Sequence, residues 1–165
     1  MAALPDAIRA MVELSPIEDV MLHVLREGLP GIAVNSLIAD DQHFPLVLVR
    51  RLASFGNWGG DERFTDQADI AVHCFVEDPD GDEDAALLSE AVRVALRNAW
   101  RRNAHIPGRG YLVKAQMVSA PRRATDWATS TGPVQYADLP TRVHRYETQY
   151  RLTIRKERSR PLPFA

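Results

Sequence analysis

The chain has 165 residues, 45% of them hydrophobic, and a formal net charge of −2 at pH 7. This length and apolar content predict a single domain over residues 1–165 with a buried core. The near-neutral charge excludes a generally cationic nucleic-acid-binding protein, and the single cysteine, Cys74, excludes an intramolecular disulfide. No stretch approaches the roughly 18 apolar residues of a membrane span, so no membrane partner is expected.

The N-terminal part predicts helical structure. Residues 1–14 are expected to form an N-terminal arm or a short helix. The sequence SPIE from Ser15 has the Ser-to-Glu spacing of a capping box and places proline at the first helical position. Because Gly28 ends the apolar period that follows, a helix is predicted over about 16–27.

Three strands are predicted next, over residues 32–39, 44–55 and 68–77. The second, FPLVLVRRLASF, starts apolar and rich in β-branched residues, which favours a central strand. The third alternates and places four apolar residues on one face: Ile70, Val72, Cys74 and Val76.

A long helix is predicted over about 83–102, after the acidic turn DPDGDED. Six apolar residues recur at helical spacing and predict a core-facing stripe: Leu88, Ala91, Val92, Ala95, Leu96 and Ala99. Four charged residues form the opposite stripe: Glu90, Arg93, Arg97 and Arg101.

The last two strands are predicted over residues 111–120, ended by Pro121, and 143–156. In the latter, even-numbered residues from His144 to Ile154 share one face, and the other face is half polar. Such alternation favours an antiparallel sheet with one covered face. We therefore predict an α+β fold, with a mostly antiparallel sheet of about four to five strands packed by one long helix and an N-terminal helix. Residues 157–165 are expected to be an extended tail.

Two polar segments lack a hydrophobic period, residues 54–67 and 121–142. Loops this long usually bind something or are disordered. Each holds a tryptophan, Trp58 and Trp127, and large aromatic side chains are over-represented at interface hot spots. We predict that both anchor contacts with a partner, and the alternative is that they fold back on their own core.

The sequence predicts no enzyme, metal site or cofactor. The acidic turn resembles part of an EF-hand loop, but no helix precedes it and the twelfth-position glutamate would fall inside a helical pattern. Its carboxylates are better explained by helix capping and the helix dipole. The five histidines lack metal-ligand spacing, and no nucleophile elbow or phosphate-binding loop is present in the sequence.

The charges are unevenly distributed along the chain. The acidic turn lies far in sequence from a basic C-terminal stretch, an asymmetry that can steer contacts between copies or attract a polyanion. We predict that the acidic turn of one copy meets the basic strand of a neighbour through six residues: Asp80, Asp82 and Asp84 on one side, and Arg145, Arg151 and Arg155 on the other.

Four segments carry a resemblance to a known family: SPIEDVMLHVLREGLPGIAV, FPLVLVRRLASFGNWGGDERFTDQADIAVHCFVED, DEDAALLSEAVRVALRNAW and RYETQYRLTIR. In their texture and order the chain resembles, over about residues 15–156, the tail terminator proteins of long-tailed bacteriophages, in particular the actinobacteriophage branch. The resemblance implies a small α+β subunit that forms a hexameric ring on the head-proximal end of the tail tube. Such a ring stops tube polymerisation and offers a surface to the head connector.

The resemblance also implies partners and a location. The partners would be further copies of the chain, the major tail tube protein and the head-tail connector proteins, with genomic DNA only passing through the ring. The protein would belong to the neck region of the virion tail, and to the host cytoplasm during assembly. The alternatives are another neck component, such as a head-completion or tail-to-head joining protein, or a nucleic-acid-binding module that uses the arginines.

Overall fold

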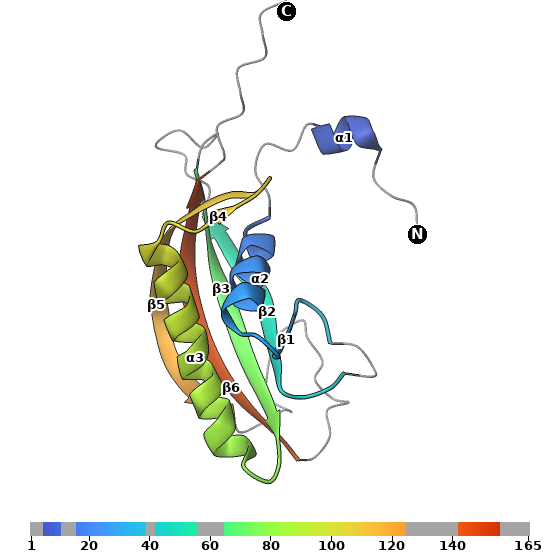
Figure 1. Ribbon diagram of the computed structural model, residues 1–165, viewed down its shortest axis with the longest axis vertical. Helices are drawn as coiled ribbons and strands as arrows, with labels where there is room; N and C mark the ends of the chain where they lie inside the picture. The colour runs from blue at the N-terminus through green and yellow to red at the C-terminus, as the bar shows by residue number, and fades with distance from the viewer. Residues whose placement is uncertain (1–4, 11–15, 39–41, 56–64, 125–141, 156–165) are drawn as a thin grey trace, which may run out of the picture.

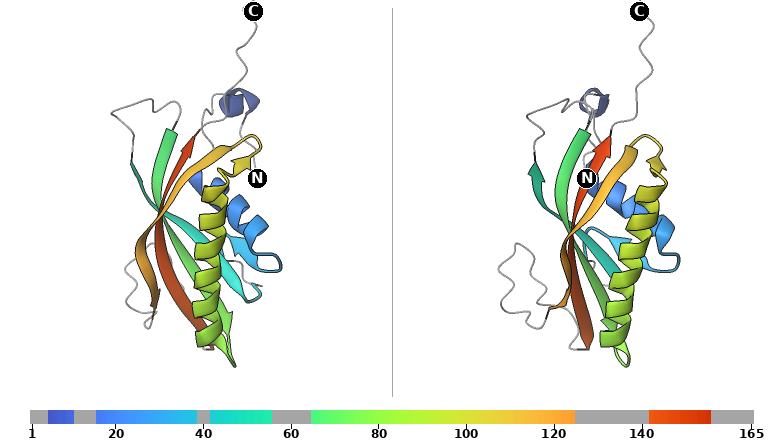
Figure 2. Two further views of the ribbon diagram at one scale, coloured as in Figure 1. Left: turned by 60° about the vertical axis from the view of Figure 1, so that its left-hand side comes forward. Right: turned by 90° about the vertical axis from the view of Figure 1, so that its left-hand side faces the viewer.

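The computed structural model describes residues 5–10, 16–38, 42–55, 65–124 and 142–155. Figure 1 shows one curled sheet with the helices α2 and α3 lying over it, and the two views of Figure 2 place both helices on the same face. The α+β class is confirmed. In chain order the elements are α1 (Asp6–Ala10), α2 (Ile17–Gly28), β1 (Ala33–Asn35), β2 (Leu46–Phe55), β3 (Thr65–Glu77), α3 (Gly81–Arg101), β4 (His105–Ile106), β5 (Gly110–Arg123) and β6 (Val143–Arg155).

The sheet is larger than predicted and it is mixed. Its six strands lie in the order β1-β2-β3-β6-β5-β4, and β1 runs parallel to β2 while the other neighbours are antiparallel. The prediction of four to five strands missed β4, because two residues are too few to show any periodicity. The arrangement of the helices also differs, since three are present in the described residues and α2 and α3 share one face.

Several element ends differ from the predicted ones. Pro121 lies inside β5 and does not end it, because it falls in a register shift of the β5–β6 pair, where a missing N–H is tolerated. Pro16 occupies the N-cap position of α2 instead of the first helical position, and it makes no side-chain capping bond. Ser15 lies outside the described residues. The helix α3 begins at Gly81, two residues before its predicted start.

The main core lies between the sheet and the helices. Four of the six residues predicted for the core stripe of α3 are buried, namely Leu88, Val92, Leu96 and Ala99, and the other two alanines pack against the cluster. From the sheet, β3 and β6 contribute alternate residues such as Ile70 and Leu152, as their patterns predicted. Each fully buried aliphatic side chain stabilises the fold by about 1.5–3 kcal/mol.

The opposite face of the sheet has a second, smaller apolar cluster near one end. Leu46, Leu48, Phe75 and Val143 are buried there, and Ala33, Ile38 and Phe44 pack against them. The expectation that only one face is covered was therefore incomplete. The chain around β1, which joins α2 to β2, supplies the covering side chains.

The two long polar segments are shorter than predicted at their described ends. Residues 121–123 belong to β5, residues 54–55 to β2 and residues 65–67 to β3. Trp58 and Trp127 lie outside the described residues, so their role stays a prediction.

Candidate interaction surface

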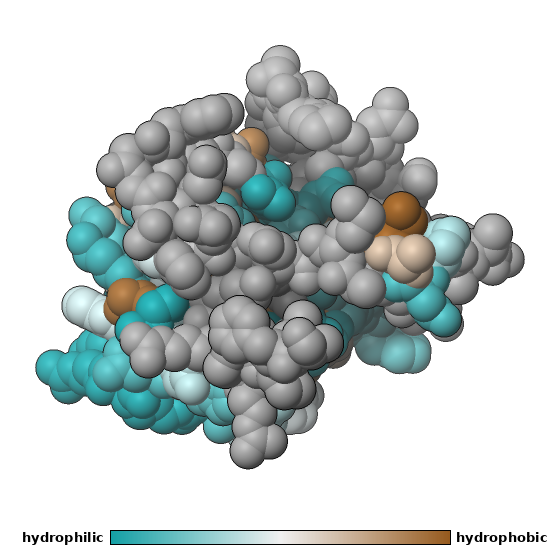
Figure 3. Space-filling view, turned by 90° about the horizontal axis from the view of Figure 1, so that it is seen from above, coloured by the Kyte–Doolittle hydropathy of each residue, from teal (hydrophilic) through white to brown (hydrophobic). Residues whose placement is uncertain are grey.

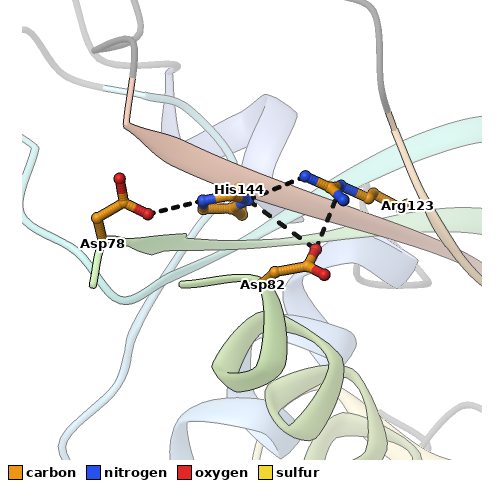
Figure 4. A network of polar contacts seen from close by, with 4 residues as sticks. All are labelled: Asp78, Asp82, Arg123 and His144. Atoms are coloured by element: carbon orange, nitrogen blue, oxygen red, sulfur yellow. Dashed lines mark hydrogen bonds and ion pairs between the residues drawn. The ribbon is translucent and has the colours of Figure 1, made fainter. Parts of the chain in front are cut away.

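Four polar side chains meet where the acidic turn enters α3 (Figure 4). The Nε2 atom of His144 lies 2.8 Å from the Oδ1 atom of Asp78, and Arg123 Nε lies 3.2 Å from Asp82 Oδ1. Arg123 also lies 3.4 Å from Nδ1 of His144, so both contacts fit a ring that donates to Asp78 and accepts from Arg123. Through these contacts, side chains at the end of β5 and the start of β6 bind to the acidic turn and the first turn of α3.

A glycine is required beside this cluster. A Cβ atom added at Gly81 would lie 2.6 Å from the imidazole of His144 and 3.2 Å from the carbonyl oxygen of Val76. The glycine in the acidic turn is therefore explained by close packing against the histidine.

The acidic residues of the turn divide into two groups. Asp82 has contacts within its own chain, whereas Asp80 and Asp84 are exposed. Asp80 is the N-cap residue of α3 but makes no side-chain capping bond. The carboxylates of the turn therefore stabilise α3 through the helix dipole and not through a capping hydrogen bond. Within the described parts of the chain, no group of three or more His, Cys, Asp or Glu residues is arranged to hold a metal ion.

Arg151 forms a bidentate ion pair across the face of the sheet that carries no helix. Its Nε and Nη2 atoms lie 2.8 and 2.9 Å from the two carboxylate oxygens of Asp69, the residue directly opposite on β3. This hydrogen bonding holds the pKa of Asp69 below its usual value. Arg151, predicted to face a neighbouring copy, therefore has a partner in its own chain.

We expect Arg151→Ala to lower the Tm by about 2 °C, because it leaves the shielded carboxylate of Asp69 without its bidentate partner. Arg151→Lys should give an intermediate loss, since an ammonium keeps the charge but cannot form the fork. Thermal unfolding followed by circular dichroism measures both. The exposed Arg97→Ala on α3 is the matched control, and an equal Tm for the two alanine variants would contradict this prediction.

A buried charged group lies further along the same face. His73 and Arg145 are only 7% and 5% exposed, although Arg145 belongs to the face of the last strand that was predicted to be half polar. Burial lowers the pKa of His73 to about 4, and the guanidinium of Arg145 acts in the same direction, while Glu147 opposes it. Arg145, predicted to lie at an interface between copies, is thus nearly buried within a single copy.

Glu147 completes this group. Arg122 and Gln149 each donate a hydrogen bond of 3.3 Å to its Oε1 atom. Burial raises the pKa of Glu147, but the bond from Gln149 and the nearby charges of His73 and Arg122 outweigh it, so the pKa is lowered overall. Two carboxylates of this face, Glu147 and Asp69, therefore each have an arginine partner within the chain.

Arg155 and the acidic turn lie at opposite ends of the sheet. Arg155 is exposed opposite Thr65, with its guanidinium 5.4 Å from the ring centroid of Tyr111. The acidic turn follows Glu77, which pairs with Val143 at the far end of β6. A strand of 13 residues spans about 40 Å. Copies side by side at one level would not bring Arg155 near the acidic turn of a neighbour, so this part of the predicted contact requires copies displaced along the strands.

The outer edges of the sheet are only partly paired among the described strands. β1 pairs with residues 46–48 of β2, and β4 pairs with residues 110–111 of β5. Residues 49–55 and 113–119 have no described strand on their outer side. Seen from the end of the sheet in Figure 3, the described surface is mostly hydrophilic with separate hydrophobic residues among the polar ones.

No protein-family model matches the chain, and no curated protein matches it. None of the described helices is long and apolar enough to span a membrane.

Proposed function

We propose that the protein is a structural subunit of a bacteriophage tail, a tail terminator. Its copies would form a ring that caps the tail tube, stops its polymerisation and joins the tail to the head connector. The support is the order of elements: apart from the short α1 and β4, it is a helix, three strands, an acidic turn, a long helix and two long strands around a long connection. This is the order on which the resemblance to tail terminators depends.

The observation that carries the proposal is the pair of partly open edges on opposite sides of one subunit. A ring needs heterologous contacts, in which one surface meets a different surface of the next copy. Both helices that cover the sheet lie on one face (Figure 2), and among the described residues the short strands β1 and β4 pair with only three residues of β2 and two residues of β5. The two ends of the sheet remain for the tube and the connector.

The test is a tube-capping assay with the major tail tube protein encoded in the same genome. We expect rings of the purified protein in negative-stain images, and shorter tubes with a ring at one end when it is present during polymerisation. Unchanged tube lengths together with the absence of rings would overturn the proposal. Binding to connector proteins alone would favour the alternative of a head-completion or joining protein.

Trp58 and Trp127 are part of this proposal as anchors for the tube or the connector. Alanine at either position should weaken tube binding and leave the Tm unchanged. The opposite pattern, a lower Tm with intact binding, would show that the tryptophans belong to the core of their own subunit.

Two exposed arginines on α3, Arg97 and Arg101, favour the DNA-binding alternative, whereas Arg93 is paired with Glu90. Two phosphate contacts would give a log–log salt slope of only about −2. A steeper slope for the isolated protein on duplex DNA would support this second function over the terminator.

A further inference from the structure

The two long strands β2 and β5, which lie beside the short outer strands β1 and β4, carry register shifts at exposed aliphatic side chains. The register shifts of β2 and β5 each skip residues, so that Leu52, Val113 and Val118 have no directly opposed residue in the sheet. These three side chains are 54%, 38% and 48% exposed. Bulges re-aim side chains at sheet edges, and here they direct aliphatic groups to the solvent on both edges.

The partly unpaired edges of β2 and β5 lie at the same height along the strands, and the two strands run in opposite directions. One row of directly opposed residues crosses the sheet from β2 to β5: Ala53, Asp69, Arg151 and Gln116. The open stretches 49–55 and 113–119 therefore lie at the same height. The strands from β2 through β3 and β6 to β5 alternate in direction, so β2 runs antiparallel to β5.

We propose that copies of the chain associate head to tail, with the β2 edge of one copy pairing antiparallel to the β5 edge of the next. Copies in the same orientation and at the same level would then share one continuous sheet. Leu52 would lie level with the stretch between Val113 and Val118 of the neighbour, where all three would lose solvent exposure. This interface deepens the proposed ring by naming its contact, and its pairing can be measured without a tail.

The edges also carry features that limit the contact. Arg51 and Lys114 are exposed, and charged residues on edge strands oppose unspecific pairing. The backbone N–H of Arg51 already donates a 2.7 Å hydrogen bond to Glu18. Because β1 and β4 already pair with one end of β2 and of β5, the remaining contact between two copies would involve about seven residues on each edge. A contact this short favours a reversible interface with a single register. It does not favour open-ended aggregation.

The experiment uses one blocked edge at a time. Leu52→Lys blocks β2 and Val118→Lys blocks β5, and each should weaken self-association at least about tenfold in sedimentation velocity. The exposed Leu87→Lys on α3, outside both edge strands, is the control and should associate like the wild type. Because all three positions are exposed, equal Tm values are expected and confirm that the variants fold.

Mixing the two blocked variants is the sharper test. Each retains one intact edge, so a mixture should form dimers containing one copy of each and nothing larger. Wild-type-like association of both single variants, a mixture without dimers, or a monomeric wild type would each overturn the inference. Edge-dependent association without tube capping would overturn the proposed function alone, and capping rings that ignore both substitutions would overturn the inference alone.

Discussion

Replacing Phe75 with alanine is expected to lower the free energy of unfolding by about 3–5 kcal/mol. Phe75 is fully buried in the smaller apolar cluster, with its ring centroid 6.4 Å from that of Phe44 and 6.2 Å from that of His73. Truncation removes a large apolar contact and leaves a cavity on the face that carries no helix. Chemical denaturation with an unchanged m-value measures the loss.

The control for this prediction is Leu87→Ala, at a side chain that is 59% exposed on α3. It should change the free energy of unfolding by no more than about 0.5 kcal/mol. A Phe75→Ala variant as stable as this control would mean that the second cluster contributes no packing. The fold would then depend on the helix-covered face alone.

The second large effect is a loss of stability in mild acid caused by His73. Its pKa in the folded protein is about 4, below the ordinary 6.5, because burial disfavours the charged ring. The unfolded chain takes up the proton near pH 6.5, whereas the folded protein resists it until about pH 4. The contribution of His73 is therefore complete above pH 6.5 and is lost as the pH falls towards 4, by about 3 kcal/mol at most.

The measurement is the free energy of unfolding between pH 7 and pH 4 for the wild type and His73→Gln. The variant should lose less stability over this window, because glutamine does not titrate. Glu147 and His73 influence each other's pKa, and the stabilisation from the lowered pKa of Glu147 is present above pH 4.5 and is lost below it, so it adds to the loss at the acidic end of this window. The exposed His23→Gln is the control, and equal slopes for the wild type and His73→Gln would contradict the account.

Local patterns predicted the regular elements well. The apolar residues of α3 recur at helical spacing because one face packs on the sheet, and Leu88, Val92 and Leu96 are buried as expected. The strand β6 alternates because its two faces meet different surroundings, and Tyr150 and Leu152 lie on the helix-covered side. Such periods depend on neighbours close in sequence, so the sequence alone reports them.

The local patterns could not predict which residues of distant strands pair with each other. Asp69 and Arg151 are 82 positions apart, and only the register of β3 against β6 brings them opposite each other. Their positions on the polar faces of two predicted strands were the one available signal. The burial of Arg145 was missed for a related reason, because alternation assigns a face to a charged residue but does not tell whether that face is covered.

The proposed function is that of a ring-forming subunit at the end of a phage tail tube. The most direct measurement is native mass spectrometry with negative-stain imaging of the purified protein, alone and with polymerised tail tubes. The account predicts closed rings of identical copies, seated on one end of each tube. A strictly monomeric protein that never binds tube ends would contradict it.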